Sequence, residues 1–221
     1  MALQIRSKKN MKKFIVVTII LFVVWGLTDI ATEQVDGKSS SAPTGKTNAP
    51  GQGNCTSCHS GTLNSGTGNL NINIGSGVTK YLPGSTYTVQ VDVNANAVTY
   101  GFSLIAQDVN GLNAGTINLI NTGNTKVKSS GGKTYVSHKN ATATSSWQFE
   151  WTAPTASVGQ IGFYAAGLAS DGNSNKSGDE TYSAIAVLID SMGTGGSSGS
   201  SGGTGGGNSG GTGGGFPGFT G

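Results

Sequence analysis

Between about residues 70 and 190 the chain alternates apolar and polar residues with a period of two, and this alternation limits its fold more than any other feature. Leu70–Ile74 and Tyr87–Val93 follow it most strictly, as strands with one buried and one solvated face do. Further strands are expected at Gly101–Ala106, Thr116–Ile120, Thr134–Ser137, Trp147–Thr152, Gly159–Ala166 and Tyr182–Ile189. About eight or nine short strands, separated by turn residues and without a helical pattern, predict an all-β fold. We expect a two-layer antiparallel β-sandwich over about residues 68–190.

The N-terminus has the pattern of an export signal. Basic residues precede an apolar run from Phe14 to Trp25, which is short for a membrane-spanning helix. We therefore expect a helical signal peptide over residues 1–31, with Met11 as an alternative start. The chain would be exported to the periplasm, the cell surface or the extracellular space of a bacterium. An uncleaved signal anchor is the alternative, and the chain would then contact the membrane only through this segment.

Composition divides the remainder of the chain into three parts. Residues 32–52 are polar and punctuated by Pro and Gly, which predicts a flexible linker. Residues 53–190 would form the folded domain. Residues 191–221 contain 16 glycines together with Ser, Thr and Asn, so we expect a disordered tail that is dispensable for folding.

The basic pI of the chain comes from the export signal. Residues 1–31 hold five of the 13 Lys and Arg and one of the 10 Asp and Glu, which leaves 8 against 9 and a net charge of −1. Because no basic cluster remains after that segment, we do not expect nucleic-acid binding.

The pentapeptide Cys55-Thr56-Ser57-Cys58-His59 contains both cysteines and one of the two histidines of the chain. A C-x-x-C-H run is typical of a c-type haem attachment site. Cys55 and Cys58 would bind one haem c covalently, and His59 would be its proximal axial ligand. A local Cys55–Cys58 disulfide in an exported protein is the alternative. The motif does not open a helix after a strand, as a thioredoxin-type pair would.

Few residues could occupy the sixth coordination position of such an iron. His138 is the only other histidine and is our first choice as the distal ligand, which makes His59 and His138 the predicted metal ligands. Met192 and an open or water-bound position are the alternatives. If haem is absent, His138 would be an ordinary solvent-facing histidine beside Lys139.

Two other groups of residues admit a functional reading. Trp147, Phe149 and Trp151 alternate and should share one strand face, where core packing is favoured over a role as a haem wall. Asp171, Asp179 and Glu180 form the only acidic concentration and could bind calcium. Their spacing does not match an EF-hand loop, so a solvated turn is favoured. No catalytic triad or carboxylate pair is recognisable by spacing.

Several stretches resemble the bacterial exported domain family called choice-of-anchor V, which is itself similar to the Reeler β-sandwich. The matching stretches are Thr44–Gly61, Tyr81–Tyr87, Tyr100–Leu104, Trp147–Pro154, Phe163–Gly167 and Ser177–Asp179. The resemblance implies an immunoglobulin/Reeler-like sandwich that follows an N-terminal C-x-x-C-H motif. It also implies a histidine near position 138 and a variable C-terminal surface anchor. In place of a recognisable anchor, this chain has the glycine-rich tail.

These features favour an exported monohaem c-type cytochrome-like domain that transfers electrons at or outside the cell envelope, with a redox protein as its partner. The first alternative is an extracellular adhesion or interaction module that binds a surface matrix and contains a Cys55–Cys58 disulfide. The second is a haem enzyme with an open distal site. No catalytic residue is expected for the favoured reading, because electron transfer or binding accounts for the motif better than catalysis.

Overall fold

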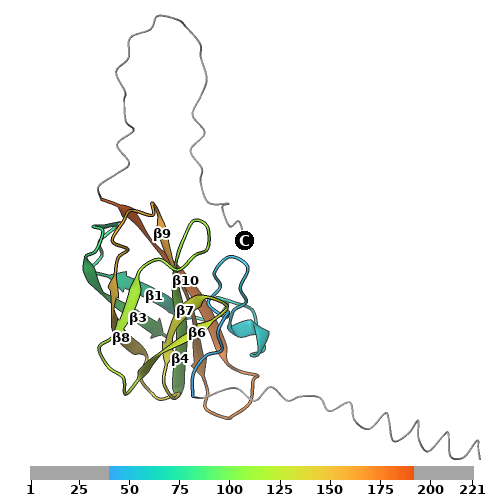
Figure 1. The fold of residues 1–221 in the computed structure, drawn as a ribbon. Coiled ribbons are helices and arrows are strands. Elements are labelled where there is room, and N and C mark those ends of the chain that lie inside the picture. Colours follow the sequence, from blue (N-terminus) through green and yellow to red (C-terminus); the bar gives the residue numbers. More distant parts are fainter. Residues whose placement is uncertain (1–39, 192–221) are drawn as a thin grey trace, which may run out of the picture.

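The computed structural model describes residues 40–191, which form two β-sheets packed face to face (Figure 1). The smaller sheet has the order β1-β3-β8-β5 and the larger one the order β2-β10-β9-β4-β7-β6. The strands are β1 (Asn69–Ile74), β2 (Lys80–Tyr81), β3 (Thr86–Asn94), β4 (Thr99–Asp108), β5 (Thr116–Leu119), β6 (Thr125–Ser130), β7 (Lys133–His138), β8 (Ser146–Thr152), β9 (Ile161–Ser170) and β10 (Glu180–Asp190). The expected all-β sandwich is confirmed.

Neighbouring strands pair antiparallel with one exception, since the short strand β2 runs parallel to β10 at its C-terminal end. The long strands β4, β9 and β10 form the centre of the larger sheet. One helical element occurs among the described residues, a single 3₁₀ turn η1 at Cys55–Ser57. No helix in residues 40–191 has the length and apolar character needed to cross a membrane.

Aromatic side chains fill the space between the two sheets. Trp147, Phe149 and Trp151 are at most 2% exposed, because every second residue of β8 faces the core. Trp151 packs edge-on against Phe163 of β9, with ring centroids 4.9 Å apart. Trp147 lies against Phe102 of β4 at 4.6 Å. The favoured core role of the three β8 aromatics is therefore confirmed.

The outer face of the larger sheet is covered in part by the segment before β1. Ala49 of this segment is buried against Ile105, Tyr135 and Tyr164. The backbone of Ala42 is tied to the sheet by two hydrogen bonds, one donated to Ser137 Oγ and one accepted from Lys128 Nζ. Residues 41–52, expected as part of a linker, thus pack on the domain. The apolar contacts explain this, because the covered sheet face would otherwise be exposed.

Two strands have no counterpart among the sequence-based expectations. β2 is only two residues long, and β6 is largely exposed and contains Lys126 and Lys128, so neither shows a clear alternation. β6 and β7 form a hairpin through Gly131 and Gly132, which both have positive φ, the geometry of a two-residue hairpin turn. The expected signal peptide and tail lie outside the described residues.

Candidate functional site: a cleft that both histidines line

A cleft of about 660 Å³ opens on the outer face of the larger sheet, at the end where β4 begins and β9 ends. Its floor comes from Gly101 of β4 and from Ala166, Leu168 and Ser170 of β9, which are neighbours in the strand register. These residues alternate with the core-facing Phe102 and so point away from the core. Small side chains on adjacent strands thus leave a hollow on this face.

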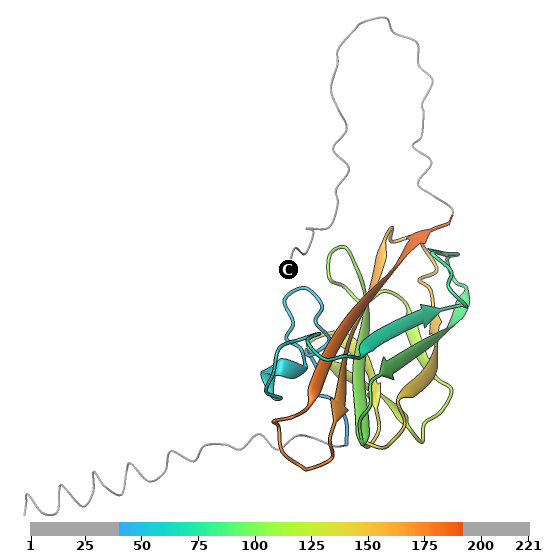
Figure 2. The same cartoon turned by 180° about the vertical axis from the view of Figure 1, so that it is seen from behind.

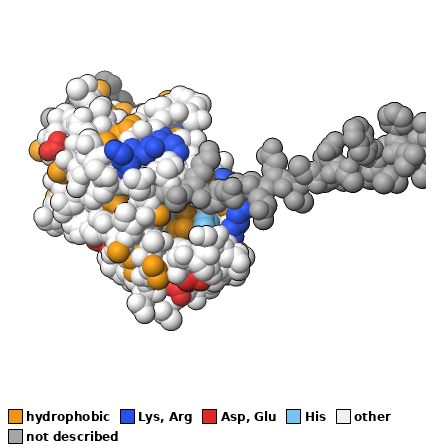
Figure 3. Space-filling model, turned by 90° about the horizontal axis from the view of Figure 1, so that it is seen from below, with side chains coloured by type: hydrophobic (Ala, Val, Ile, Leu, Met, Phe, Trp, Pro, Cys, Tyr) orange, Lys and Arg blue, Asp and Glu red, His pale blue; other side chains and the backbone are white. Residues whose placement is uncertain are grey.

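Two chain segments form the walls of the cleft. One is the Cys motif with η1, which contacts β9 and β10, and the other is the loop between β9 and β10, residues 171–179. The Cys-motif segment lies beside β10 in both opposite views of the fold (Figures 1 and 2). Seen from below, the surface has a hollow in which a histidine lies among hydrophobic side chains (Figure 3).

The Cys motif forms a tight turn that brings its two thiols and its imidazole to the same cleft. Asn54 caps η1, because its side-chain oxygen accepts hydrogen bonds from the Thr56 backbone at 2.9 Å and the Thr56 hydroxyl at 2.7 Å. The backbone N–H groups of Cys58 and His59 both donate to the Cys55 carbonyl. Cys55, Cys58 and His59 consequently line the cleft together.

Both cysteines are free thiols and partly buried. Burial raises the pKa of the Cys55 thiol to about 12, and the nearby Cys58 adds to this shift. Redox-active cysteines of the C-x-x-C type have a lowered pKa, because the thiolate is the reactive species. The raised pKa of Cys55 instead disfavours its thiolate at neutral pH.

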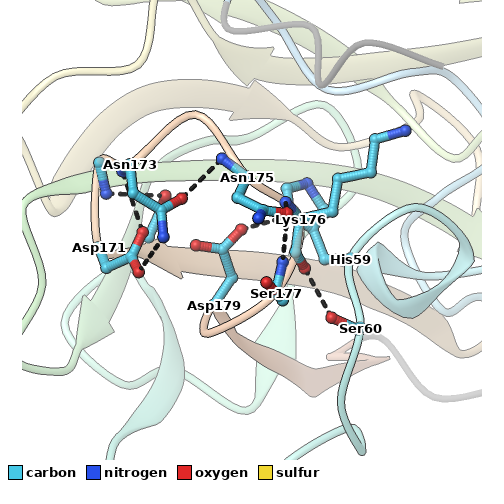
Figure 4. Close-up of polar contacts among 10 residues, drawn as sticks. His59, Ser60, Asp171, Asn173, Asn175, Lys176, Ser177 and Asp179 are labelled. Atoms are coloured by element: carbon cyan, nitrogen blue, oxygen red, sulfur yellow. Dashed lines mark hydrogen bonds and ion pairs between the residues drawn. The ribbon is translucent and has the colours of Figure 1, made fainter. Parts of the chain in front are cut away.

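His59 is held by a carboxylate from the opposite wall. Its Nδ1 atom lies 2.6 Å from Oδ2 of Asp179, whose side chain is 1% exposed (Figure 4). The walls are joined further at Ser60, whose backbone N–H and hydroxyl both donate to the Lys176 carbonyl. A hydrogen bond from Nδ1–H to the carboxylate fixes the orientation of the imidazole ring. It leaves the lone pair on Nε2, the nitrogen that could bind a metal.

His138 reaches the cleft from the end of β7. Its side chain is buried, with Nδ1 3.1 Å from the Phe102 carbonyl oxygen and 3.0 Å from the Phe102 backbone nitrogen. The ring occupies space that a side chain at Gly101 would fill: a Cβ there would lie 2.7 Å from Cε1 and 2.9 Å from Nδ1. The missing side chain of Gly101 therefore admits the imidazole to the floor of the cleft.

The structure brings Cys55, Cys58, His59 and His138 into one cleft, but places Met192 outside the described residues. Two contributors were not expected from the sequence, namely Asp179 as the partner of His59 and Gly101 as the position that admits His138. Within residues 40–191 no three His, Cys, Asp or Glu side chains converge as a metal site. Both histidines line a cleft of a size that is common for cofactor sites.

Fold and cleft together define an all-β sandwich domain with a ligand-sized cleft on the outer face of one sheet. Residues 50–171 match the Reeler domain family, and the chain belongs to that family. The matched range covers the Cys motif and every strand through β9. No curated protein matches the chain.

Solved Reeler domains are similar to this chain at low identity. The Reelin-N domain of F-spondin is 22% identical, with a TM-score of 0.48, over 59% of this chain and 91% of that one. A human F-spondin reeler domain is also 22% identical, with a TM-score of 0.46, over 59% of this chain and 94% of that one. A cohesin module from a Clostridium perfringens glycoside hydrolase is 15% identical, with a TM-score of 0.38, over 57% of this chain and 99% of that one.

Proposed function

We propose that the chain is an exported monohaem c-type cytochrome-like domain that transfers electrons at or outside the cell envelope. The observation that supports this most is that the C-x-x-C-H motif and His138, 79 positions after His59, line the same cleft. A histidine placed at random on a sandwich surface has no reason to meet the motif. In this proposal Cys55 and Cys58 would hold one haem c covalently, and His59 and His138 would be the ligands to its iron.

The residues present fit such a group in size and chemistry. The cleft volume lies within the range of about 300–1,000 Å³ that is common for cofactor sites. Both thiols are unbonded, and each could add its S–H across one vinyl C=C bond of the porphyrin to form a thioether. Lys46 and Lys176 also line the cleft and would balance the porphyrin carboxylates. Figure 4 shows the Lys176 ammonium pointing away from its own loop.

Each remaining residue of the site then has a role of its own. Asp179 orients His59 by accepting from Nδ1. In the tautomer of His138 that carries its proton on Nδ1, the Phe102 carbonyl would do the same for that ring, and Nδ1 would then no longer accept from the Phe102 backbone N–H. A proton on Nδ1 of each ring leaves the lone pair on Nε2, the nitrogen that binds iron. When bound, the haem would supply a one-electron couple. Two strong axial ligands would exclude a substrate from the iron, which favours electron transfer over catalysis.

The relation to choice-of-anchor V proteins and the cellular location belong to the same proposal. The quoted motifs of that family lie within the matched Reeler region or next to it, and the family pairs them with a C-x-x-C-H motif. An exported location agrees with a covalent haem, which is attached outside the cytoplasm. The partner would then be a redox protein, and contact with the membrane would be limited to an uncleaved signal segment.

The decisive test is to produce the full chain in a bacterium with an intact cytochrome c maturation system. We expect a Soret band and haem staining that survives denaturation. The chain with both Cys55→Ser and Cys58→Ser should lose covalent haem while circular dichroism still reports a β-sheet protein, because the core contains neither cysteine. A colourless wild-type protein with a Cys55–Cys58 disulfide would overturn the proposal and favour the interaction-module alternative.

A further inference from the structure

The loop between β9 and β10 contains a buried carboxylate oxygen whose hydrogen-bonding capacity is unused. Asp179 is 7% exposed, and its Oδ1 atom has no hydrogen-bond partner in the structure. Its other oxygen, Oδ2, accepts from His59. Burying one carboxylate oxygen without a hydrogen-bond donor is costly, because the desolvation of that atom is not compensated.

The same loop places further oxygen atoms around this position. Asp171 begins the loop, and a Cβ on Gly178 would lie 3.0 Å from Asp171 Oδ2, so this carboxylate reaches the residue that directly precedes Asp179. In Figure 4 the second oxygen of Asp179 points away from His59, toward the side of the loop where Asp171 and Asn173 lie. The Asp171 carboxylate accepts hydrogen bonds from the Asn173 backbone N–H and side-chain amide, and the Asn173 side-chain oxygen accepts from the Asn175 backbone N–H. These oxygens therefore have donors within the loop, whereas Asp179 Oδ1 has none.

We propose that this loop binds one calcium ion between Asp171 and Asp179, with the Asn173 side-chain oxygen as a further ligand. Calcium takes carboxylate, amide and carbonyl oxygens in flexible arrangements, and these are the groups present. Asp171, Asn173, Asn175 and Asp179 have the relative positions one, three, five and nine of an EF-hand loop. Lys176 and Tyr182 stand where that loop has glycine and glutamate, so this is not an EF-hand.

The ion would stabilise the wall of the cleft as well as its own loop. Asp179 would bind calcium through Oδ1 while Oδ2 stays on His59, and the Ser60 contacts with the Lys176 carbonyl join the loop to the Cys motif. The solvated turn favoured from the acidic composition alone does not account for an unpartnered buried oxygen. The proposal is independent of the haem, since every ligand named is present in the chain without it.

The test is calcium binding by the full chain after chelator treatment and desalting. Titration calorimetry should give one site with a dissociation constant of about 10⁻⁴–10⁻³ M, the range of extracellular modules with few charged ligands. At 10-fold or greater excess over that constant, calcium should raise the melting temperature by about 3–6 °C. Magnesium should give a smaller shift, because it demands a more rigid octahedron.

Asp171→Asn removes a charged ligand without touching His59, and it should abolish the calcium-induced shift. Asp108→Asn is the matched control. Asp108 also caps a loop, since its side chain accepts from the backbone N–H groups of Asn110 and Leu112, but it is the last residue of β4 and precedes the β4–β5 connection. This control should keep the full shift. If Asp171→Asn does not fold, Asn173→Ala serves in its place and should weaken binding. The proposal fails if wild type shows neither heat nor shift, or if Asp171→Asn responds like wild type.

Discussion

Nδ1 of His59 lies 2.6 Å from Oδ2 of Asp179, although the two residues are 120 positions apart in the sequence. The histidine ring is mostly buried and the carboxylate side chain almost completely so. A carboxylate at Nδ1 makes an imidazole a stronger electron donor to a metal at Nε2 than a neutral acceptor does. In the proposed haem-loaded protein it would stabilise ferric iron relative to ferrous iron.

Asp179→Asn should therefore raise the midpoint potential of the haem-loaded protein. The potential should rise by about 60 mV for each tenfold decrease in the stability of the ferric state relative to the ferrous state, which is the value for a one-electron couple. Potentiometric titration followed by the visible spectrum measures it, with calcium held constant. Asp108→Asn, far from the cleft, is the control and should leave the potential unchanged. An unchanged potential in Asp179→Asn would show that this contact does not tune the iron.

Gly101→Ala tests whether the missing side chain admits His138 to the cleft. The backbone of Gly101 does not have a positive φ, so alanine fits the strand conformation. The three atoms nearest to the new Cβ, at 2.7–3.3 Å, all belong to the His138 imidazole. The ring should be displaced, which converts a low-spin haem spectrum to a high-spin one. Stability should fall by about 1–3 kcal/mol, as is usual for overpacking.

Ser103→Ala is the matched variant for this test. Ser103 is the next residue of β4 on the same face, and its hydroxyl is buried without a partner. Removing that hydroxyl should leave the spectrum as in wild type and should not lower stability. If both variants, or neither, change the spin state, the Gly101 position has no particular part in placing His138.

The sequence predicted the sandwich because alternation is a local property: β1, β3 and β8 each show their buried face in the residue pattern. It missed β6, whose charged residues hide the alternation, although the Gly131-Gly132 pair signals a hairpin. The Cys motif and His138 were found by residue type. Asp179 and Gly101 could not be assigned in this way, because their roles arise from contacts between distant segments.

The raised pKa of Cys55 predicts how the stability of the haem-free protein depends on pH. Because burial raises this pKa from 9.0 to about 12, the unfolded chain loses the thiol proton above pH 9 while the folded chain keeps it. The stability that the buried, protonated thiol contributes is fully present below pH 9 and is lost as the pH rises toward 12, by about 1.4 kcal/mol per pH unit.

Urea unfolding at pH 8 and pH 10 measures this effect. Wild type should lose more stability between the two pH values than Cys55→Ser, because serine does not ionise in this range. Buried tyrosines such as Tyr164 also have a raised pKa, and the comparison of the two chains removes their contribution. Equal losses in both chains would contradict the assignment of the pH dependence to Cys55.

His138→Ala decides between electron transfer and an open-site haem enzyme. In the proposed arrangement the wild-type spectrum is six-coordinate and low-spin, and ferrous protein does not react with carbon monoxide, because His138 occupies the sixth position. The variant should become high-spin and should bind carbon monoxide rapidly. Lys139→Ala is the control. Lys139 follows His138 in the sequence and its ammonium donates a hydrogen bond to the Thr122 carbonyl, but it does not line the cleft.

A wild type that is already high-spin, or a variant with an unchanged spectrum, would show that His138 is not the ligand. The open-site haem enzyme would then become the better hypothesis.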